Sequence, residues 1–300
     1  MKFDHILYHR NCPDGFSALS LLMRSDIIVP GSFYWGDSPD TKIIPRHINN
    51  KTIIAVDLGY SKDIIMGILK VCKKLVFIDH HITHHKSRSL IKDDKFTYIY
   101  NEKLCGATLV FNYLNRFNTD KIKKKTPLYL KYIQDNDLGI WQYPETKMFL
   151  VALEIKILHN PKYNTRKRLS KWNILYIDDN VKRYIKKGKI YLEYRYFLLE
   201  RNSMHYKLVT IKHANRKYLF VTVNNSGALS GKLGCYLNDK FPETDGSIVY
   251  QYLDGRRVRC ILRSNDIAIN WLAERYGGGG HPKAAAFDIT IKTFDWLDKL

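Results

Sequence analysis

Three short apolar segments in the first hundred residues are each followed directly by histidine or aspartate, residue types that bind metal ions. Of all features of the sequence, this pattern places the strongest constraint on the fold. The segments are residues 3–8 with His9 after them, residues 52–56 with Asp57, and residues 75–78 with Asp79, His80 and His81. Residues 14–23 and 64–72, which lie between them, have apolar side chains at helical spacing. Strands that alternate with helices pair in parallel, so we expect a doubly wound α/β sheet with these polar residues at its carboxyl edge.

The second half of the chain has a different pattern. The 300 residues are enough for two domains. A basic and aromatic stretch reads as a helical connector, and strands with one helix follow it, which predicts a smaller α+β domain. The predicted division is a metal-binding catalytic domain over residues 1–158, a basic connector over residues 159–204 and a substrate-binding domain over residues 205–300.

Composition indicates the kind of partner and compartment. Lysine and arginine outnumber aspartate and glutamate by 49 to 29, a formal charge of +20. This charge attracts polyanions, so we expect a nucleic-acid partner, although a coding bias toward lysine would explain part of it. The five scattered cysteines form no Cys-x-x-Cys pair, which disfavours disulfides and structural zinc. Without a membrane-spanning run or a secretory signal, a cytoplasmic protein is expected, and a homodimer is compatible with it.

The candidate site residues combine imidazole and carboxylate groups. They are His9, Asp14, Asp57, Asp79, His80, His81, Asp135 and Asp137. Such a set suits Mn²⁺ or Mg²⁺ better than a structural zinc ion. Two ions about 3.5–4 Å apart could hold a water molecule and clamp a phosphoryl group. A single aspartate after a strand is more often a helix cap, so the prediction of a two-metal centre depends on the whole set.

Five segments of the chain carry a family resemblance. They are residues 9–15 (HRNCPDG), residues 56–61 (VDLGYS), the triplet Asp79, His80 and His81, residues 135–138 (DNDL) and residues 277–285 (GGGGHPKAA). In this order they resemble the motifs of the DHH phosphoesterase superfamily, and the last is similar to the signature of its accessory domain, DHHA1. The resemblance therefore covers both halves of the chain.

The resemblance implies a centre of two divalent ions, most simply Mn²⁺, with Mg²⁺ as the alternative. Asp57 would bridge the two ions and His9 would bind the first. Asp14 and His80 would bind the second, together with one more carboxylate from the fourth motif. Each of these positions is filled in this sequence by the residue type that the motif requires.

The fourth motif offers two carboxylates, and the triplet offers two candidate catalytic residues. Asp137 is preferred over Asp135 as the ligand because it directly precedes the apolar Leu138. His81 would lie beside the scissile phosphate, as a hydrogen-bond donor or as an acid for the leaving group. Asp79 would orient an imidazole ring.

Cys12 is the departure from the family pattern. The first motif commonly has two aspartates separated by one residue, and here Cys12 and Asp14 stand at those positions. A thiolate can bind a divalent ion, but it is a softer ligand than a carboxylate and must first lose its proton. The first metal position is therefore expected to be weaker, or to take another metal.

The glycine run near the end predicts a ligand-binding element. Gly278, Gly279 and Gly280 would let the backbone approach an anion, and His281 could hydrogen-bond a phosphate or a base. Arg263 resembles the substrate-holding arginine of the family and could grip a phosphate. The alternative is a flexible linker between a helix and a strand.

The function implied is a two-metal phosphodiesterase or exonuclease. It would act on short or single-stranded oligonucleotides and release mononucleotides, with the C-terminal domain holding one end of the substrate. One rival is an enzyme for cyclic dinucleotides or polyphosphate. The other is a catalytically weak nucleic-acid-binding protein, which only Cys12 favours.

Overall fold

The structure, a computed structural model, describes residues 1–39, 41–117, 125–225, 227, 229–254 and 256–291. The chain divides into two compact units, Met1–Leu192 and Glu193–Leu300. Among the described helices, none combines the length and the apolar character needed to span a membrane. The three-part division expected from the sequence stays a prediction.

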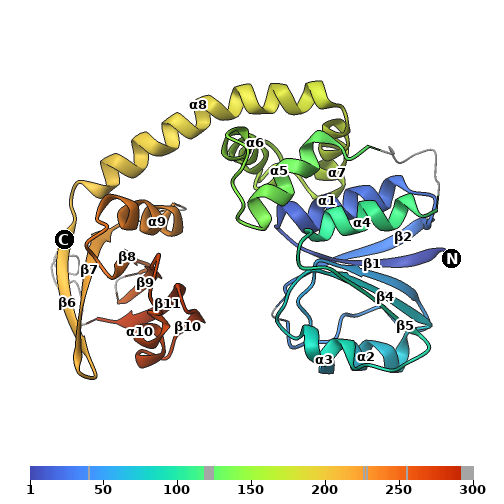
Figure 1. Cartoon of the computed structure of the whole chain (residues 1–300), viewed down its shortest axis with the longest axis horizontal. Coiled ribbons are helices and arrows are strands. Elements are labelled where there is room, and N and C mark those ends of the chain that lie inside the picture. The colour runs from blue at the N-terminus through green and yellow to red at the C-terminus, as the bar shows by residue number, and fades with distance from the viewer. Residues whose placement is uncertain (40, 118–124, 226, 228, 255, 292–300) are drawn as a thin grey trace. The chain divides into compact units, whose positions relative to one another are not determined.

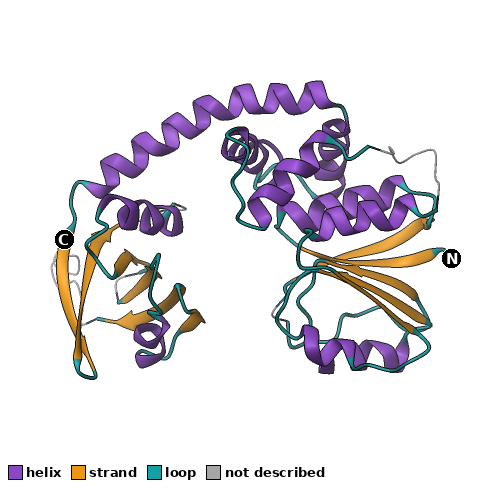
Figure 2. Cartoon of the chain, viewed as in Figure 1, coloured by secondary structure: helices purple, strands orange, loops and turns teal. Residues whose placement is uncertain are grey.

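The first unit is built on a parallel sheet of five strands in the order β2-β1-β3-β4-β5 (Figures 1 and 2). The strands are β1 (Phe3–His9), β2 (Ile28–Asp37), β3 (Thr52–Val56), β4 (Lys74–Asp79) and β5 (Phe96–Tyr100). Every neighbouring pair is parallel. The α/β class and the parallel sheet predicted for this half are confirmed.

Helices cover both faces of this sheet (Figure 1). On one face lie α1 (Pro13–Arg24) and α4 (Gly106–Asn115), and on the other α2 (Lys62–Val71) and α3 (His85–Ser89). Alternate residues of β3 point to opposite sides: Ile54 belongs to the core beneath α1 and α4, whereas Ile53 belongs to the core beneath α2. Parallel strands buried on both faces need near-continuous apolar runs, as the central strands β3 and β4 have.

More helices follow the sheet in the chain. They are α5 (Leu128–Asp137), α6 (Glu145–Leu153), a π-helical turn at Glu154–Leu158, α7 (Thr165–Asn173), a 3₁₀ turn at Ile174–Tyr176 and α8 (Asp178–Ser203). Trp172 of α7 is buried, and its ring lies 4.8 Å from that of Phe16 in α1. Its indole N–H donates a hydrogen bond of 3.2 Å to Ser17 Oγ. Helix α7 lies within the predicted connector, residues 159–204, but it packs into the hydrophobic core of the first unit.

The second unit has a mixed sheet of six strands in the order β10-β11-β9-β8-β7-β6. Its strands are β6 (Lys207–His213), β7 (Arg216–Asn224), β8 (Gly246–Tyr252), β9 (Arg257–Arg263), β10 (Gly279–His281) and β11 (Ala284–Thr290). Only the β7–β8 pair is parallel among these described strands. Helices α9 (Ser230–Lys240) and α10 (Asn270–Arg275) contribute to separate apolar clusters of this unit.

The sequence pattern predicts a helix over residues 266–276, but α10 is shorter. The backbone N–H of Ile267 donates to Ser264 Oγ at 3.2 Å, and that of Ile269 donates to the Pro282 carbonyl at 2.7 Å. Because these donors are satisfied by partners outside a helix, the helix begins only at Asn270.

Candidate metal centre

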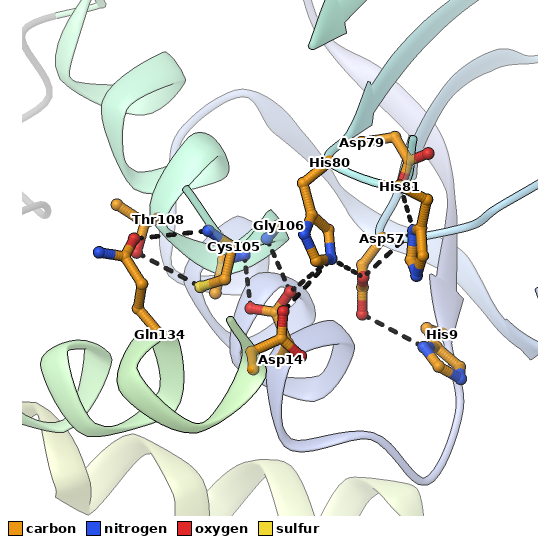
Figure 3. A network of polar contacts seen from close by, with 12 residues as sticks. His9, Asp14, Asp57, Asp79, His80, His81, Cys105, Gly106, Thr108 and Gln134 are labelled. Atoms are coloured by element: carbon orange, nitrogen blue, oxygen red, sulfur yellow. Dashed lines mark hydrogen bonds and ion pairs between the residues drawn. The ribbon is translucent and has the colours of Figure 1, made fainter. Parts of the chain in front are cut away.

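The candidate site lies at the carboxyl ends of neighbouring parallel strands (Figure 3). His9 is the last residue of β1, Asp57 follows β3, and His80 follows β4. Because β3 pairs with both β1 and β4 in parallel register, these three strand ends are adjacent. The structure thus places the strand-end residues together, as the pattern of apolar segments indicates.

Asp57 is the centre of the cluster. It is 1% exposed. Its Oδ2 lies 3.3 Å from His9 Nδ1, and its Oδ1 lies 3.3 Å from His80 Nε2 and 4.0 Å from His81 Nδ1. Its backbone has φ +56°, a conformation that aspartate tolerates better than most residues but that still costs roughly 1 kcal/mol. Strand β3 therefore ends in a strained turn that directs this carboxylate between three imidazoles.

Asp14 enters the cluster from α1 and is held there by the start of α4. The N–H groups of Gly106 and Ala107 donate to its two carboxylate oxygens at 2.6 and 2.8 Å. His80 Nε2 lies 3.9 Å from Asp14 Oδ2. A Cβ atom added at Gly106 would lie 2.8 Å from Asp57 Cβ and 2.9 Å from Asp14 Oδ2. The apolar spacing after Gly106 predicts only a helix beginning there, but Gly106 lies against two of the candidate ligands.

The two carboxylates of the fourth motif have different surroundings. Asp137 Oδ2 lies 3.3 Å from His80 Nε2, so this residue joins the cluster. Asp135 instead accepts hydrogen bonds from the N–H of Gln142 at 2.8 Å and the hydroxyl of Thr146. Asp135 therefore links α5 to the start of α6, and its oxygens are already satisfied by protein groups.

Three overlapping groups of possible ligands result from this arrangement. Within each group the ligand atoms lie within 4.8 Å of one another. The groups are His9, Cys12 and Asp57; Asp57, His80 and His81; and Asp14, His80 and Asp137. Asp57 and His80 each belong to two of them, so the described residues provide one continuous set of donors.

Unsatisfied buried atoms indicate that the set fits divalent cations. His9 Nδ1, Asp57 Oδ2 and Asp137 Oδ2 are buried and have no hydrogen-bond partner among the described residues. Burying carboxylate oxygens without a partner is costly. Cations bound between these atoms would satisfy them, and imidazole and carboxylate are suitable donors for divalent ions.

The electrostatics of the cluster depend on burial and on mutual repulsion. Burial would raise the pKa of Asp57, but the neighbouring imidazoles of His80 and His9 outweigh it and lower that pKa to about 2. Burial and the charge of Asp57 raise the pKa of Asp137 to about 6 and that of Asp14 well above its usual range. Burial disfavours the charged form of His80, yet the surrounding carboxylates raise its pKa to about 9. Without a cation, the site therefore retains protons near neutral pH.

These shifts predict that metal binding releases protons. Below pH 9 the His80 ring is protonated, and a cation must displace that proton to bind there. We expect Mn²⁺ affinity to fall as pH is lowered from 9 to 6, with about one proton or more released per chain at neutral pH. Isothermal titration calorimetry in buffers of different ionisation enthalpy measures this release, and a binding heat that does not depend on the buffer would contradict it.

His81 is positioned by a chain of buried polar contacts. Its Nδ1 lies 2.7 Å from Asp79 Oδ1. Asp79 is fully buried and also accepts a hydrogen bond from Arg88, whose guanidinium donates in addition to the His81 carbonyl at 3.0 Å. Burial lowers the pKa of His81, but Asp79 outweighs it and raises that pKa above its ordinary value. Arg88 was not among the predicted residues, because its neighbours in sequence give it the appearance of a surface cation.

In the second unit, part of the predicted substrate site lines a cavity of about 680 Å³. Arg263, Gly278 and Gly279 are among the lining residues, whereas Gly280 and His281 are not. A Cβ atom at Gly280 would lie 2.5 Å from the Ala284 carbonyl oxygen. Gly279 and Gly280 therefore belong to strand β10, which pairs closely with β11.

Comparison with known proteins supports the resemblance at the level of the fold. No protein-family model matches the chain. An uncharacterised protein, R106 of Acanthamoeba polyphaga mimivirus, is 24% identical over 299 residues, which are 95% of this chain and 67% of that protein. A solved structure of the pGpG-specific phosphodiesterase PggH from Vibrio cholerae matches with a TM-score of 0.55 and 15% identity, covering 98% of this chain and 96% of that one.

A further solved structure, an exopolyphosphatase-related protein from Bacteroides fragilis, matches with a TM-score of 0.48 and 17% identity. The match covers 99% of this chain and 89% of that one. The fold resembles that of the PggH phosphodiesterase, and the sequence motifs resemble those of the DHH phosphoesterase superfamily.

Proposed function

We propose that the chain is a metal-dependent phosphoesterase that hydrolyses the phosphodiester bonds of short or single-stranded oligonucleotides and releases mononucleotides. The observation that carries the proposal is the continuous set of donors around the buried carboxylate of Asp57. Clusters of this composition are suited to two-metal hydrolysis of phosphate esters. The fold shared with a pGpG-specific phosphodiesterase is compatible with a short nucleotide chain as substrate.

Each residue of the cluster has a proposed task. His9, Cys12 and Asp57 would hold one divalent ion. Asp14, His80 and Asp137 would hold the other, with Asp57 shared. When bound, the two ions supply an activated water molecule and neutralise charge on the phosphate oxygens.

His81 would provide proton transfer. Since Asp79 holds its Nδ1, the ring can use Nε2 to donate a proton to a phosphate oxygen or to the leaving oxygen. The raised pKa of His81 keeps more of the ring protonated near neutral pH than an ordinary histidine would have. Arg88 supports this role through Asp79, without itself facing the substrate.

The cavity of the second unit is a proposed nucleotide-binding site. Arg263 offers a guanidinium suited to a phosphate. Tyr276, which is 51% exposed, stacks on Phe287 at 4.8 Å with an interplanar angle of 14°. Both rings line the cavity, so a base could extend this stack.

Helix α8 presents an exposed stripe that would suit a single-stranded polyanion. At about 100° per residue, the part of α8 in the first unit exposes Arg183, Lys186, Lys187 and Ile190 on one face. The part in the second unit, taken by itself, exposes Tyr194, Phe197 and Arg201. The rings of Tyr194 and Phe197 lie 6.2 Å apart and nearly parallel. Cations beside exposed aromatic rings are typical of surfaces that bind single-stranded nucleic acid.

Removing cations from this stripe should weaken the binding of longer strands selectively. For the double variant Arg183→Ala and Lys187→Ala, we expect the slope of log K against log salt to fall by about 1.4, or about 0.7 per lost phosphate contact. Dinucleotide hydrolysis should not change. Lys182→Ala with Lys189→Ala, on another face of α8, is the matched control. Fluorescence anisotropy at several salt concentrations measures both pairs, and equal slopes would rule out the stripe.

Cleavage assays test the proposed function directly. The metal-free chain, supplied with Mn²⁺, would be incubated with end-labelled RNA and DNA from dinucleotides up to about 16 nucleotides, the upper range for a single-strand site. Cyclic dinucleotides, polyphosphate and pyrophosphate would be tested alongside. We expect mononucleotide release that EDTA abolishes. Cleavage of only the other phosphates would retain the metal centre and reject the nuclease, and nucleic-acid binding without cleavage of any substrate would favour a binding protein.

A further inference from the structure

The two outer groups of the metal centre differ in their donor atoms. The group of Asp14, His80 and Asp137 offers only oxygen and nitrogen donors. The group of His9 and Asp57 also contains a sulfur donor, that of Cys12. Oxygen donors favour Mn²⁺ and Mg²⁺, and thiolate favours softer ions such as Zn²⁺ and Co²⁺. The two groups of donors are therefore expected to prefer different metal ions.

We propose that Cys12 is a direct metal ligand and that the centre takes two different metals, a zinc-like ion at the group containing Cys12 and a manganese-like ion at the other. The inference rests on the metal centre of the proposed function. It goes further because it assigns a distinct ion to each position and makes Cys12 responsible for the difference.

Two observations besides the thiol point to a cation at this position. Asp57 is 1% exposed, and its Oδ2 has no hydrogen-bond partner among the described residues. His9 Nδ1, which is also buried and without such a partner, lies 3.3 Å from that oxygen. A buried oxygen and a buried nitrogen thus face each other beside the half-buried Cys12. A cation with a thiolate ligand would satisfy both.

The local backbone holds Cys12 close to His9. Cys12 is the residue that precedes α1, and Pro13 begins the helix. A Cβ atom added at Gly15 would lie 2.4 Å from the His9 carbonyl oxygen, so the first turn of α1 packs directly on the end of β1. This contact keeps the sulfur near the imidazole before any metal binds, which lowers the cost of ordering the ligands.

The ligand number also suits zinc. Three protein ligands, one each from imidazole, thiolate and carboxylate, leave a fourth tetrahedral position for water, as in catalytic zinc sites. In the binding step a sulfur–metal bond forms, the S–H bond breaks, and the proton leaves to the buffer. No electron is transferred, and no other reactant is needed.

Cobalt binding to the metal-free full chain tests the inference independently of hydrolysis. Thiolate bound to Co²⁺ absorbs in the near ultraviolet. We expect the parent to develop this absorption and the Cys12→Ser variant to lack it. Zn²⁺ affinity should fall in that variant by at least about 10–100-fold. Loss of a residue that only hydrogen-bonds to a ligand lowers metal affinity by that factor, and loss of the ligand itself should lower it at least as much. Mn²⁺ binding at the other group should remain.

Two further variants make the outcome decisive. Cys105, which is buried next to Asp14, is the other thiol near the cluster. Absorption that survives in Cys12→Ser and disappears in Cys105→Ser would overturn the inference. The Cys12→Asp variant should lose the cobalt absorption and bind a second Mn²⁺ instead, and it serves as the test should Cys12→Ser fail to fold.

Failure of this inference can be told apart from failure of the proposed function. Bound Co²⁺ without thiolate absorption, or no bound Co²⁺, would reject Cys12 as a ligand even if Mn²⁺ supports oligonucleotide cleavage. Thiolate absorption in a chain that cleaves no phosphate ester would reject the proposed function and leave the metal assignment in place.

Discussion

Replacing Asp57 by asparagine is expected to lower kcat/KM for oligonucleotide cleavage by more than about 100-fold, since loss of an outer-shell partner alone costs 10–100-fold. Asp57 is shared by two of the ligand groups. Asparagine keeps the size of the side chain and tolerates the φ of +56° at this position, so the backbone should be retained. The change removes the negative charge that cations would bind on both sides.

The same variant should lose stabilisation by metal. For the parent, a cation at 100 times its Kd stabilises the folded state by about 2.7 kcal/mol, and differential scanning fluorimetry with and without Mn²⁺ detects this as a rise in Tm. We expect the rise to be nearly absent in Asp57→Asn. Asp63→Asn, an exposed residue of α2 with the same change of charge, is the matched control. A normal rise in Asp57→Asn would show that metal binds elsewhere.

Much of the first unit follows from local sequence patterns. The unbroken apolar run over residues 52–56 predicts strand β3 (Thr52–Val56), and the helical spacing over residues 128–137 predicts helix α5 (Leu128–Asp137), both with the bounds that the structure shows. Residues 257–263 (RVRCILR) also predict a strand, β9 (Arg257–Arg263), and its burial alternates along the strand as expected.

Other elements depend on contacts that the sequence does not reveal. Strand β5 (Phe96–Tyr100) was not predicted, since it lies at the edge of the sheet and its residues are only partly buried. Helix α9 was not predicted either, because Gly231 and Gly234 weaken its helical signal. A Cβ atom at Gly234 would lie 2.8 Å from Arg263 Cγ, so this glycine allows packing against a residue far away in sequence.

The residues of the candidate site also fall into two kinds, those that the sequence predicts and those that only the structure reveals. His9, Asp57 and His80 could be predicted to meet, because strand order in a parallel sheet brings the ends together. Gly106 and Arg88 could not, because their roles depend on side-chain contacts between different elements. The structure also separates Asp137 from Asp135 by their hydrogen bonds, a distinction that the sequence resemblance left open.

Gly106→Ala is expected to lower kcat/KM strongly as well, although Gly106 has no side chain that could bind a metal ion. The added Cβ would meet Asp57 Cβ at 2.8 Å and Asp14 Oδ2 at 2.9 Å. Both neighbours are buried and held by other contacts, so neither can move away easily. One carboxylate must therefore shift. Because a small displacement in a preorganised site can cost about 100-fold in rate, we expect a loss of that order in kcat/KM.

The loss should come with weaker Mn²⁺ binding and a less stable fold, since overpacking a buried position typically costs about 1–3 kcal/mol. Asn112→Ala, at an exposed position of α4, is the control and should stay within about 0.5 kcal/mol of the parent. Mn²⁺ titration and urea unfolding of both variants separate the two effects. If Gly106→Ala bound Mn²⁺ and cleaved oligonucleotides as the parent does, Asp14 and Asp57 would not form the rigid centre on which the proposed chemistry depends.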